Sequence, residues 1–64
     1  MLLKQLKKGE YFTKKKTDEP KESEVWVRDD YDRSTRTYTV YCFDDVNHIQ
    51  QLSGETEVYT DFVF

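Results

Sequence analysis

One stretch of the chain decides the fold: Arg36-Thr37-Tyr38-Thr39-Val40-Tyr41-Cys42-Phe43-Asp44-Asp45. It is the longest run of β-branched and aromatic residues in the sequence, and it contains neither glycine nor proline, which favours a strand. Side chains alternate along a strand, so one face holds Tyr38, Val40 and Cys42, and the other holds Thr39, Tyr41 and Phe43. Neither face is strongly polar. The sequence therefore predicts a central strand that has other strands beside it.

Shorter segments on both sides have the pattern of further strands. We expect a first strand at residues 10–15 with Phe12 facing inward, a second at 23–29 and a last one at 57–64. Residues 49–52 form either a fourth strand or a helical turn. Asp and Ser in residues 30–35 favour a hairpin with a type I turn or a bulge. Residues 16–23 are polar and contain Pro20, which predicts an exposed loop.

These elements predict an all-β fold, a small barrel of four to five antiparallel strands with little or no helix. The 64 residues form one domain, in which five tyrosines, four phenylalanines and one tryptophan must supply much of the buried area. Closing the sheet into a barrel buries these rings and removes open strand edges. Residues 1–8 hold Leu2, Leu3 and Leu6, and we expect this segment to cap one end of the barrel.

The net charge of −3 is unevenly distributed: residues 1–16 hold six lysines against one glutamate, and the rest of the chain is acidic. A duplex-DNA-binding domain is usually basic throughout. One cysteine, Cys42, excludes an internal disulfide and predicts a reduced, cytoplasmic protein in which Cys42 is a small buried side chain. The sequence has no apolar run of transmembrane length and no signal peptide, so we expect no membrane partner.

Two motifs at the ends of the chain are typical of one barrel family. The segment Leu6-Lys7-Lys8-Gly9-Glu10-Tyr11-Phe12 resembles the L-x-x-G-(D/E)-x-F start of many SH3-like barrels, and Leu52-Ser53-Gly54-Glu55-Thr56-Glu57-Val58 resembles their L-x-G-(D/E)-x-x-V return strand. With Val25-Trp26-Val27-Arg28, Tyr31-Asp32-Arg33 and Phe43-Asp44-Asp45-Val46-Asn47 between them, the chain is similar to short bacterial SH3-like β-barrel proteins of phages and mobile elements. The resemblance implies a fold and a genomic setting, and it implies no activity.

Two polar clusters offer side chains that bind metals in other proteins. Asp44, Asp45 and His48 are ligand types for zinc or manganese, and the second cluster contains Asp29, Asp30 and Asp32. Both patterns are more typical of solvated turns, in which aspartate caps backbone N–H groups. The chain also lacks a nucleophile motif, a P-loop and a dinucleotide fingerprint. We therefore predict no metal, no cofactor, no catalytic residue and no enzymatic activity.

The strongest candidate for a binding surface is aromatic. If Val25 and Val27 face the core with Val40, the side chains on the opposite face are those of Trp26, Arg28, Tyr41 and Phe43. Aromatic rings with an arginine are typical of protein interfaces and also suit the stacking of unpaired bases. The alternative is that these four are themselves buried, under the N-terminal leucines, under Phe64 or under a second copy of the chain.

Lysines near the N-terminus provide a second candidate surface, for phosphate contacts. Its members are Lys7, Lys8, Lys14, Lys15 and Lys16. Two functions remain open. We favour a non-catalytic interaction module that binds a protein partner or itself through the aromatic face. The alternative is a nucleic-acid-binding accessory protein of a phage or mobile element that uses the basic end of the chain.

Overall fold

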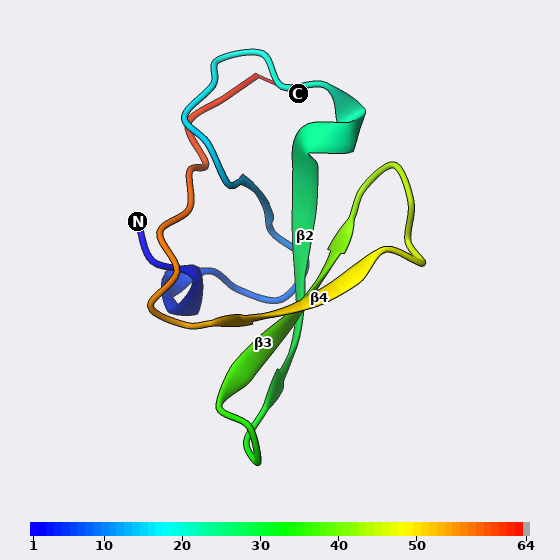
Figure 1. Ribbon diagram of the computed structural model, residues 1–64. Coiled ribbons are helices and arrows are strands. Elements are labelled where there is room, and N and C mark those ends of the chain that lie inside the picture. The colour runs from blue at the N-terminus through cyan, green and yellow to red at the C-terminus, as the bar shows by residue number, and fades with distance from the viewer. Residues whose placement is uncertain (64) are drawn as a thin grey trace.

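The computed structural model describes residues 1–63, which form an all-β fold around a four-stranded antiparallel sheet (Figure 1). The strands follow one another across the sheet in chain order: β1 Tyr11–Thr13, β2 Val25–Asp32, β3 Thr37–Cys42 and β4 Ile49–Ser53. Two short 3-10 turns, η1 Leu3–Gln5 and η2 Glu22–Glu24, are the only helical elements in this part of the chain. The predicted all-β class is confirmed. Residues 49–52, for which the sequence allowed either a strand or a helical turn, belong to strand β4.

The first strand lies where the sequence places it, within residues 10–15. Phe12 is fully buried and so faces inward as predicted. Before β1 the chain turns at Gly9, whose φ of 94° lies in the region that glycine adopts without steric cost. After β1, most side chains of residues 16–23 are exposed, and the turn η2 begins at Glu22.

A bulge in β2 fixes how the central strands pair. At the hairpin end Asp32 lies opposite Thr37 and Tyr31 opposite Tyr38, whereas Arg28 lies opposite Val40. One extra residue of β2 is therefore accommodated between Arg28 and Tyr31, which is the definition of a β-bulge. The Lys8 ammonium is 2.7 Å from a carboxylate oxygen of Asp30, which lies in this irregular segment.

The bulge reverses the face pairing expected from the sequence. Without it, the hairpin register would place Val27 opposite Cys42. With it, Cys42 lies opposite Trp26, and Val27 lies opposite Tyr41. Because a one-residue slip moves every side chain to the other face of a strand, the expectation that Trp26 and Arg28 share a face with Tyr41 and Phe43 is wrong.

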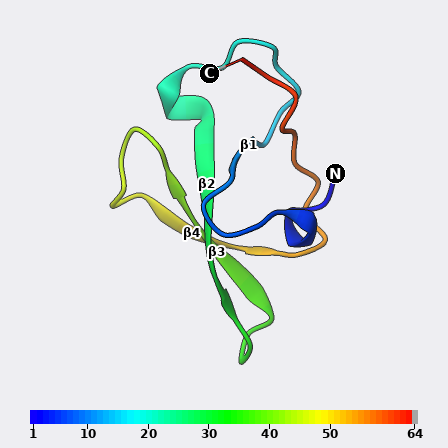
Figure 2. The same ribbon diagram turned by 180° about the vertical axis from the view of Figure 1, so that it is seen from behind.

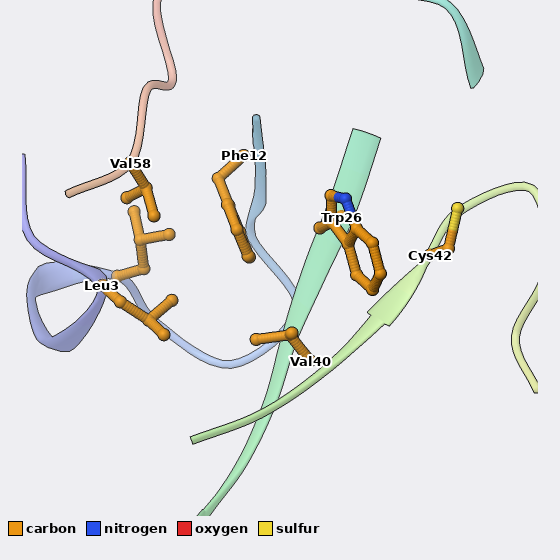
Figure 3. Packing of buried hydrophobic residues seen from close by; sticks show 7 residues of the cluster. Leu3, Phe12, Trp26, Val40, Cys42 and Val58 are labelled. Atoms are coloured by element: carbon orange, nitrogen blue, oxygen red, sulfur yellow. The ribbon is translucent and has the colours of Figure 1, made fainter. Parts of the chain in front are cut away.

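The main core lies on the face of the sheet that bears Trp26, which we call the inner face. Phe12 and Trp26 are directly opposite on β1 and β2, and Phe12 lies between Val58 and Trp26 (Figure 3). The cluster joins all parts of the chain from the first turn to the segment after β4: Leu3, Leu6, Phe12, Trp26, Val40, Cys42 and Val58. Leu3 and Leu6 thus pack into this core.

The C-terminal segment is not the strand expected at residues 57–64. Within the described residues it makes two isolated bridges, Glu57 with Leu2 and Tyr59 with Thr13, and Phe64 lies outside them. The N–H of Thr13 donates to the carbonyl of Tyr59 at 2.9 Å, and the reverse bond is 3.0 Å. Figures 1 and 2 show this orange segment beside η1. The four-stranded sheet itself is open.

Candidate functional site

A row of apolar side chains crosses all four strands on the face away from the core. Tyr11 lies opposite Val27, Val27 opposite Tyr41, and Tyr41 opposite Ile49. Residues directly opposite one another in an antiparallel sheet point to the same face. We call these four residues the outer row and their side of the sheet the outer face.

The outer row is continued by Phe43 at the end of β3. The Phe43 N–H donates to the carbonyl of Val25 at 2.9 Å, which extends the β2–β3 pairing by one residue. The Phe43 and Tyr11 rings meet edge to face, with centroids 5.5 Å apart. Val25 and Val27 are buried, and these rings flank them across the strands. The outer face therefore has an ordered aromatic layer and not a set of loose side chains.

Much of this layer remains in contact with solvent. Tyr11 is 43% exposed, Phe43 37% and Ile49 57%, while Tyr41 is half-buried. The charged content of the chain is 36%, yet the outer row contains no charged residue. Its exposed members lie on both sides of Val27, which is buried, and exposed apolar side chains gathered on one face of a small domain are a usual mark of an interaction surface.

Trp26 and Arg28 lie on the other side of the sheet. Only 7% of Trp26 is exposed, because the Lys14 ammonium lies 4.0 Å from its ring centre and the His48 ring packs edge to face at 5.1 Å. The Arg28 guanidinium stacks on the ring of Tyr38 at 4.5 Å. The structure thus divides the four predicted partner-binding residues into an inner pair and an outer pair, Tyr41 and Phe43.

The five candidate phosphate-binding lysines do not form one surface patch of free charges. Lys8 is ion-paired with Asp30, and this hydrogen bond raises the pKa of the Lys8 ammonium. Lys14 donates a hydrogen bond to Gln50 and covers the Trp26 ring, and partial burial there lowers its pKa. The remaining three, Lys7, Lys15 and Lys16, are exposed.

A shallow hollow of about 210 Å³ lies beside Trp26 on the inner side. Its lining consists of Thr13, Lys14, Lys15, Thr17, Glu24 and Trp26. The Thr13 hydroxyl is not directed to a ligand, since it donates to the carbonyl of Lys15 at 2.6 Å. The hollow is therefore lined by two lysine ammonium groups, one carboxylate and the edge of the Trp26 indole ring, whose face Lys14 already covers.

One of the two predicted acidic clusters lies in a turn, whereas Asp29, Asp30 and Asp32 lie at the end of strand β2. Asp32 accepts hydrogen bonds from the N–H and hydroxyl of Ser34, and Asp45 accepts one from the N–H of Asn47. Among residues 1–63, no three histidine, cysteine or acidic side chains are gathered as a metal site would require. His48 is instead part of the packing around Trp26. Asp32 and Asp45 thus have the backbone-capping role that turn chemistry predicts, and Asp29 and Asp30 contact the Lys8 ammonium.

Three members of the outer row, Tyr11, Val27 and Ile49, are not among the binding residues predicted from the sequence. Alternation places Tyr11 on the face opposite to Phe12, but the sequence does not show that this face is a binding surface. Val27 was expected to face the core together with Val40, and the bulge in β2 places it on the other face. Ile49 was missed because its segment was not assigned to a strand. None of these three is an unusual residue type, and the register of the four strands places all of them in the row.

No helix in the described part of the chain has the length and apolar character needed to cross a bilayer. In comparisons with known proteins, no family model, no curated protein and no solved structure matches the chain. The function must therefore be argued from the geometry of the chain itself.

Proposed function

We propose that this chain is a non-catalytic interaction module that binds a protein partner through its outer face. The observation that supports this most strongly is the uncharged row Tyr11–Val27–Tyr41–Ile49, which crosses the whole sheet and is exposed at both ends. Tyrosine is enriched among the residues that dominate binding energy, because it buries a large area at a small entropic cost. A rigid sheet positions such rings without further ordering.

The SH3-like barrel and the phage or mobile-element setting belong to the same proposal. Tyr59 pairs with the side of Thr13 that faces away from β2, so a short fifth segment lies next to β1. A final segment beside the first strand is what the barrel proposal requires, and this bridge supports it. The free, buried thiol of Cys42 is compatible with the cytoplasmic location that we predict.

The proposal is tested with two matched tyrosines. Tyr11 and Tyr31 are each 43% exposed, but Tyr11 belongs to the outer row and Tyr31 packs against Tyr38 on the inner face. Binders are selected from a displayed random-peptide library with the wild-type chain. We expect Tyr11→Ser to weaken them about tenfold, since a tyrosine that is buried on binding contributes on the order of 1–2 kcal/mol. Tyr31→Ser is expected to leave affinity unchanged.

Titration calorimetry with the selected peptides gives the affinities, and circular dichroism checks that both variants remain folded. If Tyr31→Ser weakens the peptides and Tyr11→Ser does not, the binding surface lies on the inner face and the proposal is wrong. A library selection that yields no binder contradicts it as well.

The nucleic-acid alternative has less support from the geometry. The Trp26 ring is not accessible for base stacking, because Lys14 and His48 pack against it, and Lys8 of the basic end is paired with Asp30. We expect labelled single-stranded DNA and RNA to show no salt-sensitive change in fluorescence anisotropy. Binding that weakens steeply as salt rises, and that Lys15→Ala and Lys16→Ala reduce further, would replace the protein-binding proposal with this one.

A further inference from the structure

The bulge in β2 places two carboxylates side by side on the outer face. The residues on either side of the bulge, Arg28 and Tyr31, both belong to the inner face, because they pair with inner-face residues of β3. In a β-bulge two residues of one strand oppose a single residue of the other, so Asp29 and Asp30 both lie opposite Thr39. Alternation along β3 assigns Thr39 to the outer face, and the two carboxylates lie there with it.

A third carboxylate, that of Asp32, shares this face. Asp32 lies opposite Thr37, whose position on β3 also belongs to the outer face. One lysine serves the whole group: the Lys8 ammonium is 2.7 Å from Asp30 and 3.9 Å from Asp29. Within residues 1–63 Asp32 has no ion pair. The outer face therefore has an excess of negative charge beside its uncharged row.

The aromatic rings of the two faces differ in their contacts with cations. On the inner face the Lys14 ammonium covers the Trp26 ring, and the Arg28 guanidinium stacks on the Tyr38 ring. On the outer face the central ring of the row, that of Tyr41, has no lysine or arginine stacked on it among the described residues. Tyr41 is only half-buried, so a cation from a partner can stack on this ring.

We propose that the partner segment on the outer face presents an arginine together with its apolar side chains. The inference rests on the proposed function and names the chemistry of its partner. A guanidinium can stack on a tyrosine ring and pair with a carboxylate through its planar fork. Thr39 is two residues from Tyr41 on the same face of β3, which is a separation of about 7 Å. The carboxylates opposite Thr39 are therefore within reach of an arginine placed on Tyr41.

The same charges argue against a nucleic acid on this face. Its phosphate groups would approach the three aspartates of β2, and like charges that meet across an interface weaken binding. A basic protein segment is attracted instead, and complementary charge also speeds its approach. The occupant that fits both the uncharged row and the carboxylates beside it is a protein segment of positive net charge.

The inference is tested first on the chain. Peptides selected with the wild-type chain are sequenced, and we expect them to be enriched in arginine and to bind more weakly as salt rises. Asp29→Asn removes the carboxylate that is farther from Lys8 and keeps the size of the side chain. It should weaken the peptides about fivefold at low salt. Asp18→Asn is the matched control, since it removes the same charge from an exposed position in the loop 16–23 and should change affinity less than twofold.

A second measurement leaves the chain unchanged and so does not depend on the folding of a variant. The arginine of a selected peptide is replaced with glutamine, and titration calorimetry compares the two peptides. We expect the replacement to weaken binding to the wild-type chain about tenfold. Against Asp29→Asn it should weaken binding less than threefold, because part of the contact is already lost.

Failure of this inference can be told apart from failure of the proposed function. Neutral or acidic peptides that Tyr11→Ser weakens, and that Asp29→Asn and salt do not, would overturn the arginine contact and leave the outer face as the binding surface. Equal effects of Asp29→Asn and Asp18→Asn would overturn it too, since net charge alone would then explain the binding. Peptides that Tyr11→Ser leaves unaffected would overturn both proposals.

Discussion

Replacing Trp26 with alanine is expected to lower the free energy of unfolding by about 3–5 kcal/mol. The reason is the register: Trp26 lies between Phe12 on β1 and Cys42 on β3 and is 7% exposed. The substitution leaves a large cavity in a core that has few other large side chains. It also removes the ring against which Lys14 and His48 pack. Since a chain of this length has a total stability of roughly 3–10 kcal/mol, the variant should be partly or largely unfolded at 25 °C.

Urea denaturation followed by far-ultraviolet circular dichroism measures this loss. The control is Ile49→Ala, which truncates an apolar side chain that is 57% exposed and should cost less than about 1 kcal/mol. If Trp26→Ala costs no more than Ile49→Ala, the indole ring is at the surface and the division of the sheet into an inner and an outer face is wrong.

Replacing Phe12 with alanine is expected to have an effect of the same size, about 3–5 kcal/mol. Phe12 is the largest fully buried side chain and fills the space between Val58 and Trp26 (Figure 3). It thereby joins the segment after β4 to the four-stranded sheet. Losing it should therefore weaken the docking of residues 56–59 as well as the core.

Backbone amide hydrogen exchange distinguishes the loss of core stability from the weaker docking of residues 56–59. We expect Phe12→Ala to accelerate exchange at Val58 and Tyr59, whose N–H groups donate to Met1 and Thr13. Phe12→Leu keeps most of the buried volume and should cost less than about 1.5 kcal/mol. Equal stability of the wild type and Phe12→Ala would show that the docked C-terminal segment does not depend on this core.

The fold class was predictable from the sequence because it depends on local patterns. Alternation and β-branched residues placed β3 and the start of β2 within a few residues of their bounds, and Gly9 marked a turn. The inward position of Phe12 followed from the same alternation. The last strand was predicted wrongly. Residues 57–63 have the composition of a strand but are paired only at Glu57 and Tyr59, and residue composition does not show which partners are within reach.

The candidate site was only half predictable, because it depends on how β2 and β3 are paired. Alternation correctly grouped Tyr41 with Phe43 and Trp26 with Arg28 as neighbours on their own strands. A single residue, inserted in β2 between Arg28 and Tyr31, decides which side chains of β2 share a face with which side chains of β3. The bulge is stabilised from outside the hairpin, where Lys8 contacts Asp30 and the Gly9 N–H donates to the Arg28 carbonyl. These contacts involve residues about 20 positions away in sequence, so the local pattern contains no sign of them.

The most direct test of the account is nuclear magnetic resonance mapping of a selected peptide on the isotope-labelled wild-type chain. The account predicts that the largest shift changes occur at the outer row and Phe43: Tyr11, Val27, Tyr41, Phe43 and Ile49. The Trp26 indole N–H should change little. Changes concentrated instead at Lys14, Thr17 and the Trp26 indole would place the ligand in the hollow on the inner side and contradict it.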